Sequence, residues 1–184
     1  IGLGLLIFLF PPLYGEGYDA LGPLLNGQPI SYDGETVLSF MLHKPWLVPV
    51  FFALILLLKV FSMTLTNAGG GVGGTFGPTL FVGAIAGFLL ARVTNLLMAG
   101  TEFVVPEQNF VLVGMAGLMA GVMQAPMTAI FLIAEISGGY ELFIPLIITS
   151  TIAFGTIRLF EKYSIYTKRI AMTGDLLTHD ISHA

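Results

Sequence analysis

Long apolar runs, separated by glycine, proline and polar turns, dominate this chain. An apolar run of about 20 residues is long enough to cross a bilayer as a helix. Such runs occur at residues 45–65, 79–100, 109–139 and 142–160. Pro126 interrupts the third run, where it removes a backbone donor and breaks the helix. Because the alternation typical of strands is missing, the pattern predicts an all-α membrane protein.

The other segments predict shorter helices. Residues 1–10 form an apolar run that Pro11 and Pro12 should end. Turn signals fill residues 13–45, where YDALGPLLNG predicts one short helix. A basic, amphipathic segment, EKYSIYTKRIAMTG, follows residue 160. Short apolar helices broken by glycine or proline are tolerated at membrane depth where protein buries them or where they line a cavity. This pattern favours transport over simple anchoring.

Composition narrows the possible functions. Hydrophobic residues make up 55% of the chain and charged residues 10%, against about 25% charged in soluble domains. The sequence has no cysteine and only scattered histidines, so we expect no disulfide, no metal site and no cofactor. An intramembrane enzyme would need a catalytic constellation inside a helix. No histidine and no aspartate pair lies in an apolar run, so we expect no enzyme. The net charge of −4 is spread over loops, so we also expect no nucleic-acid partner.

Charged residues also predict an orientation. Lysine and arginine gather at residues 158–169, whereas residues 100–110 have no basic residue and carry two glutamates. Basic residues favour the cytoplasmic side, so the C-terminal end should be cytoplasmic. Two charges lie within apolar runs: Lys59, which should snorkel or face protein, and Glu135, which is either a functional acid or a helix-end acid bonded to the backbone.

The stretch NAGGGVGGTFGPTLFVGAIAG, residues 67–87, contains the strongest candidate for a site. Pro78 fits the first turn of a helix, where no backbone donor is needed. The N–H groups of Thr75, Phe76 and Gly77 would then be free donors at the partially positive end of that helix. Such an end can bind an anion without a fixed cation, and weak binding lets an ion leave a pore again. The competing interpretation is a glycine hinge or a close helix crossing.

Several motifs resemble one family. GGTFGP is similar to the G-x-F-x-P signature of the ClC chloride channels and chloride/proton exchangers. GMAGLMAGVMQAPMTAIFLIAEISGGYELFIPLIIT, residues 114–149, resembles the segment that follows this signature, and SIYTKRI resembles the last membrane helix. The resemblance implies that residues 1–172 form the second inverted-repeat half of a ClC-type transmembrane domain, with short, tilted and re-entrant helices. Residues 173–184 would begin a cytoplasmic tail.

The same resemblance implies the roles of the loop residues. The backbone amides of Thr75 and Phe76 would bind the central anion. Gly74, Gly77 and Pro78 would support the loop, because glycine lets the backbone approach the ion closely. The expected ligand is chloride or a similar anion.

A tyrosine hydroxyl near the end of the chain would complete this half of the site. The family pattern places a hydrophobic residue before the tyrosine and another four residues after it. Ile165 and Ile170 satisfy this pattern for Tyr166, whereas Lys162 precedes Tyr163. We therefore expect Tyr166 to bind the anion; the competing interpretation is an interfacial tyrosine.

Further expectations concern partners. The resemblance implies a homodimer in a plasma (inner) membrane, with residues 120–155, including Ile130 and Ile147, at the interface. It also implies a separate N-terminal half, since the family's serine-bearing loop and gating-glutamate motif do not occur here. Whether the protein is a channel or an exchanger stays open. The alternative is a non-conducting, structural or split half of a transporter. The resemblance favours Glu135 as a backbone-bonded acid outside the anion path.

Overall fold

The computed structural model describes residues 2–28, 41, 44, 46–71, 73–100, 102 and 104–173. All the elements in these ranges are helices, which confirms the predicted all-α class. They are α1 (Gly2–Leu9), the 3₁₀ helix η1 (Pro11–Leu13), α2 (Tyr18–Leu25), α3 (Val48–Ala68), α4 (Phe76–Leu97), α5 (Glu107–Met123), α6 (Pro126–Ile136), α7 (Phe143–Phe160) and α8 (Thr167–Thr173). The expected start of a tail at residues 173–184 lies, apart from its first residue, outside the described residues.

Helix boundaries follow the proline and glycine signals. Within the described residues, α3, α4 and α7 are long and apolar enough to cross a membrane, and α5 and α6 are shorter. The apolar run at 109–139 is split as expected: α5 ends at Met123 and α6 begins at Pro126. Between them Gln124 adopts a left-handed conformation with φ of 54°. This turn reverses the chain inside an apolar sequence.

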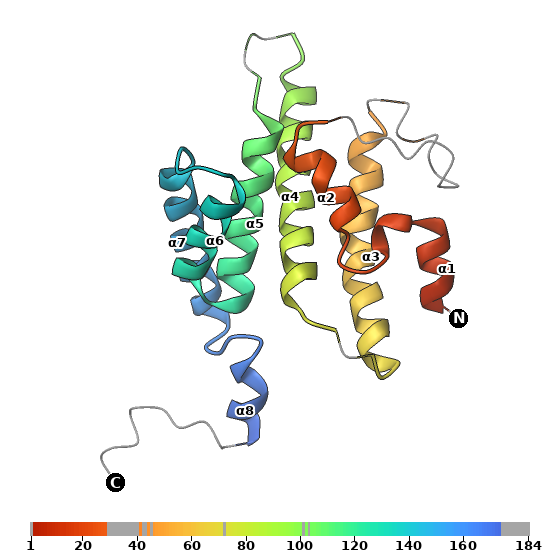
Figure 1. The fold of residues 1–184 in the computed structure, drawn as a ribbon, viewed down its shortest axis with the longest axis vertical. Helices are drawn as coiled ribbons and strands as arrows, with labels where there is room; N and C mark the ends of the chain where they lie inside the picture. Colours follow the sequence, from red (N-terminus) through yellow and green to blue (C-terminus); the bar gives the residue numbers. More distant parts are fainter. Residues whose placement is uncertain are drawn as a thin grey trace.

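The helices form a layer in which α4 and α5 are central (Figure 1). Helix α3 packs against one side of this pair, while α6 and α7 pack against α5 on the other side. The short helices α1 and η1 contact α3, and α2 contacts α4 and α5. The amino end of α4 and helix α8 both lie toward the lower end in this view, opposite the connection between α4 and α5 (Figure 1).

Glycines allow α4 and α5 to cross with their backbones in contact. A Cβ atom added to Gly83 would lie 2.6 Å from the carbonyl oxygen of Gly114, and one added to Gly114 would lie 2.9 Å from the Cα of Gly87. A Cβ on Gly87 would overlap the carbonyl oxygen of Phe110. Small residues at such spacing let helices approach closely in lipid, so these glycines position α4 for the loop at its amino end.

Candidate functional site

The amino end of α4 presents unused backbone donors. Thr75 is the N-cap of this helix, but its side chain makes no capping hydrogen bond. The first bond of the helix joins the Thr79 amide to the Thr75 carbonyl oxygen at 3.0 Å. Pro78 has no N–H, and the N–H groups of Thr75, Phe76 and Gly77 make no hydrogen bond in the part of the chain that the structure describes. These donors and the helix dipole produce a partially positive end.

The Thr75 hydroxyl bonds to a distant tyrosine instead of capping the helix. Its Oγ1 donates to the hydroxyl of Tyr166 at 3.0 Å, across 91 positions of sequence. Tyr166 lies directly before α8, and its hydroxyl donates to the Sδ atom of Met123 at 3.6 Å. The structure therefore brings the end of α5, the start of α8 and the amino end of α4 together at one point.

This point is accessible from one side. The side chain of Phe76 is 37% exposed and that of Tyr166 is 54% exposed. The hydroxyl end of Tyr166 reaches Met123 at the edge of the hydrophobic core. Phe76 and Tyr166 are thus open to a small ligand, whereas Gly77 is buried.

Tyr163, the other candidate tyrosine, lies in a different environment. It lines a hollow of about 360 Å³ with Arg158, Lys162 and Gln124. The Nζ atom of Lys162 lies 5.6 Å from the centre of the Tyr163 ring, and Arg158 donates to the Lys162 carbonyl oxygen at 2.7 Å. Thr75 is not part of this hollow. The structure thus places Tyr166, and not Tyr163, beside the loop.

The three supporting residues of the loop have different surroundings. Gly74 has open space where a side chain would be. Gly77 is buried, and a Cβ atom there would lie 2.6 Å from the carboxyl carbon of Glu16. Pro78 occupies the first turn of α4, as expected, and lines a cavity together with Gly74.

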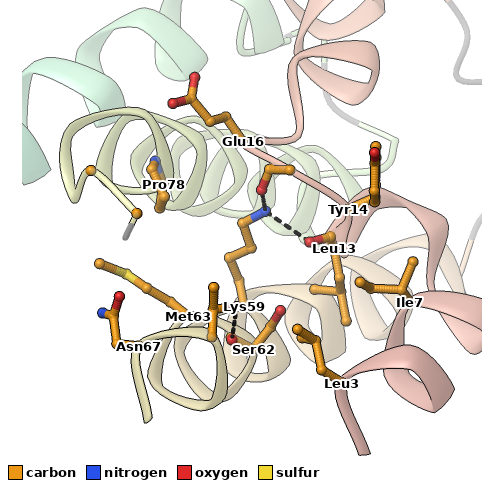
Figure 2. A pocket seen from close by; sticks show the side chains of 14 residues that line it. Leu3, Ile7, Leu13, Tyr14, Glu16, Lys59, Ser62, Met63, Asn67 and Pro78 are labelled. Atoms are coloured by element: carbon orange, nitrogen blue, oxygen red, sulfur yellow. Dashed lines mark hydrogen bonds between the residues drawn. The ribbon is translucent and has the colours of Figure 1, made fainter. Parts of the chain in front are cut away.

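This cavity has a volume of about 330 Å³ and lies between the loop before α4 and the helices α1 and α3 (Figure 2). Its charged lining residues, within the described part of the chain, are Lys59 and Glu16. Lys59 is 3% exposed, so it faces protein and does not snorkel. Its Nζ atom donates to the carbonyl oxygens of Leu13 at 3.2 Å and Gly15 at 2.8 Å. It also lies 4.7 Å from the centre of the Phe81 ring on α4.

The sequence alone does not predict the contacts of Lys59 or the position of Glu16. Lys59 was recognised as a charge inside an apolar run, but its partners are backbone carbonyls 46 and 44 positions away, which no local pattern reveals. The available signal for Glu16 was the triplet Gly15-Glu16-Gly17, an acid between two glycines. Glycines are common in ordinary turns, so the sequence does not single out this acid.

Two other expectations require correction. Glu135 is exposed at the last turn of α6, and its carboxylate makes no hydrogen bond in the described structure, so the expected bond to the backbone is absent. Ile130 is only 4% exposed and belongs to the core of the chain, whereas Ile147 is 39% exposed. Ile130 therefore does not lie on an outer surface.

Among the described residues, no cluster of three histidine, aspartate or glutamate side chains could hold a metal.

Comparison with known proteins gives consistent matches. Residues 1–158 match the family model described as voltage gated chloride channel. The chain is 32% identical over 143 residues to a "Putative chloride channel protein ClcB-like" of Ralstonia nicotianae, covering 78% of this chain and 33% of that protein. It is 32% identical over 169 residues to a "Voltage-gated ClC-type chloride channel ClcB" of Escherichia coli, covering 92% of this chain and 36% of the relative. A protein with the same name from Citrobacter koseri is 30% identical over 171 residues, with 92% and 36% covered. The chain thus spans about a third of the length of these curated relatives.

Proposed function

Because the chain belongs to the voltage-gated chloride channel (ClC) family, we propose that it takes part in transport of chloride or a similar anion across a membrane. In this proposal the chain is the second inverted-repeat half of a ClC-type transmembrane domain and supplies the G-x-F-x-P loop. The amides of Thr75 and Phe76 and the hydroxyl of Tyr166 bind the anion. The protein needs no cofactor and catalyses no covalent reaction.

The hydrogen bond between Thr75 and Tyr166 carries the proposal. In this bond the Tyr166 hydroxyl accepts, and its own hydrogen is donated to the Sδ atom of Met123. Turned from this sulfur toward an anion, the O–H would act as a neutral donor beside the free N–H groups, and together they would replace part of the hydration shell of the ion. No lysine or arginine side chain takes part in this bond. Binding by neutral donors is weak enough to let the ion move on, which conduction requires.

The remaining parts of the pathway come from partners. A complementary N-terminal half would supply the other anion-binding loop and the gating acid, consistent with the length of the relatives. A second copy would dock on the outer face of α6 and α7. Exposed apolar side chains form this face: Met127, Phe131, Ile144, Ile147, Ile148 and Ile152. These partners make the working unit a homodimer of complete subunits.

The orientation of the chain in the membrane follows from the charged residues at the two ends of the helical layer. The basic residues Arg158, Lys162 and Lys168 lie around the end of α7 and in α8, away from the connection between α4 and α5 that holds Glu102 (Figure 1). Basic residues favour the cytoplasmic side. We therefore place α8 and the amino end of α4 toward the cytoplasm of a plasma (inner) membrane.

The test is a halide titration of the complete protein by calorimetry, combined with chloride flux from vesicles. Replacing Tyr166 with Phe removes one neutral hydrogen bond, worth about 0.5–1.5 kcal/mol. Chloride affinity should fall by about two- to tenfold. Tyr163→Phe is the matched control and should leave affinity unchanged, because Tyr163 lines a neighbouring hollow that does not include Thr75 or Phe76.

Two results would contradict the proposal. A large effect of Tyr163→Phe with none from Tyr166→Phe would remove Tyr166 from the site. Absence of both halide binding and flux would favour the alternative, a non-conducting structural or split half of a transporter. The test includes this alternative because the chain spans only about a third of the length of its relatives.

A further inference from the structure

Glu16 places a carboxylate at the amino end of α4. If Gly77 had a Cβ atom, that atom would lie 2.6 Å from the carboxyl carbon of Glu16 and 2.7 and 2.9 Å from its two oxygens. Gly77 is the second residue of α4 and is buried. The acid therefore lies directly against the helix end whose N–H groups are unused, although it comes from the turn between η1 and α2.

The backbone on both sides of this acid is fixed. On one side Lys59 donates to the carbonyl oxygens of Leu13 and Gly15, as Figure 2 shows. On the other side Gly17 is buried, has φ of 84°, and packs on the ring of Phe81 in α4. A side chain at Gly17 would be strained and would overlap that ring. The turn thus holds Glu16 at α4 through contacts from both α3 and α4.

The carboxylate makes no close contact with a cation, although its charge is attracted to Lys59 across the cavity. Glu16 makes no ion pair and no side-chain hydrogen bond in the part of the chain that the structure describes. Lys59, the other charged group of the cavity, donates its hydrogen bonds to carbonyl oxygens and attracts Glu16 only over a longer distance. A negative group at a helix amino end is favourable. The partially positive end of α4 is therefore already partly occupied by an acid of the same chain.

We propose that Glu16 is a tethered competitor for the transported anion, held at the amino end of α4 by Lys59 and Phe81, and that it sets how tightly this end binds halide. The inference rests on the proposed anion site at Thr75 and Phe76. An anion bound there and the Glu16 carboxylate repel each other, because they have the same charge and share one helix end. Halide binding requires the carboxylate to move outward, and this requirement keeps binding weak enough for release.

The direct test replaces Glu16 with Gln, which keeps the shape and removes the charge. Halide affinity of the complete protein, measured by calorimetric titration with sodium bromide, should rise by about two- to tenfold, the range expected for a charge at a helix end. Glu16→Asp keeps the charge and should stay close to wild type. Glu141→Gln, at an exposed acid between α6 and α7, is the matched control and should have no effect.

The outcomes separate this inference from the proposed function. If wild-type protein binds bromide and Tyr166→Phe weakens it, while Glu16→Gln and Glu16→Ala both leave affinity unchanged, Glu16 is not a competitor and the proposed site stands. A rise of similar size in Glu141→Gln would also overturn the inference, since it would reveal a general charge effect. If wild-type protein binds no bromide, the proposed function fails and the inference with it.

Discussion

Two groups of glycines in this chain serve different physical needs. At the crossing of α4 and α5, Gly83, Gly87 and Gly114 bring backbone against backbone, and any Cβ atom there would meet main-chain atoms. In the loop before α4, Gly74 has open space around it, and at Gly77, in the first turn of α4, the nearest atoms to an added Cβ belong to the end of the Glu16 side chain. The crossing needs glycine for packing, whereas the loop has open space next to Gly74.

This difference explains why sequence alone left two interpretations open. A glycine-rich stretch in a membrane helix is typical of close helix contact, and the GAIAG part of this stretch, residues 83–87, does make such a contact. The preceding residues do not. They end at a helix whose first donors are unused and whose N-cap threonine bonds to Tyr166. Neighbouring parts of one motif therefore differ: one packs helices together, and the other leaves donors free for the anion-binding role that we propose.

The largest effect is expected at the crossing. Replacing Gly114 with Val places a side chain against the backbone of α4, which cannot shift without separating the two central helices. Overpacking of this kind typically costs about 1–3 kcal/mol or more, so we expect a severe loss of folded protein. The yield of monodisperse protein in detergent measures it. Gly22→Ala in α2, where nothing lies within 4 Å, is the control. A normal yield for Gly114→Val would show that the crossing is not tightly packed.

The outer face of α7 differs from the crossing of α4 and α5 because its side chains are exposed. Ile148 and Ile152 are exposed, at 53% and 62%, so Trp at either position should leave the chain folded but weaken the proposed dimer through overpacking. Cross-linking in detergent should show a largely monomeric protein. Trp at the buried Ile130 should instead reduce the folded yield, and Leu57→Trp on the exposed face of α3 should leave the dimer intact. Unchanged dimers in both α7 variants would place the interface elsewhere.

A smaller effect, on function rather than folding, is expected in the loop. Gly77→Val meets the flexible end of Glu16, which can move, so folded yield should be near normal. The added side chain crowds the donors of α4, and chloride flux should fall by roughly tenfold, about 1.4 kcal/mol. Gly74→Ala, with open space around it, should lose less flux. If Gly77→Val lost folded protein and not flux per molecule, the loop would be a packing element like the crossing.

Most of the fold could be predicted because the helices are marked locally. Apolar length indicated α3, α4 and α7, and Pro126 marked the start of α6. The family resemblance on GGTFGP is confirmed by the match over residues 1–158. The helix expected at 79–100 starts earlier, at Phe76, because proline is tolerated in the first turn of a helix and does not delay its start.

The surroundings of the site could not be predicted, since they depend on tertiary packing. The contact of Glu16 with Gly77 depends on the position of the turn before α2, which Lys59 links to α3. The burial of Ile130 depends on which side of α6 faces α5 and α7, and a helix that is apolar all round does not reveal that side. The roles of Thr75, Phe76 and Tyr166 in anion binding stay predictions.

The most direct test of these roles is anomalous diffraction from crystals of the complete protein soaked in bromide. The account predicts a bromide peak within hydrogen-bond distance of the Thr75 and Phe76 amides and the Tyr166 hydroxyl, and a weaker peak there in Tyr166→Phe. Bromide peaks that all lie away from the amino end of α4, in wild-type protein with this loop well ordered, would contradict the account.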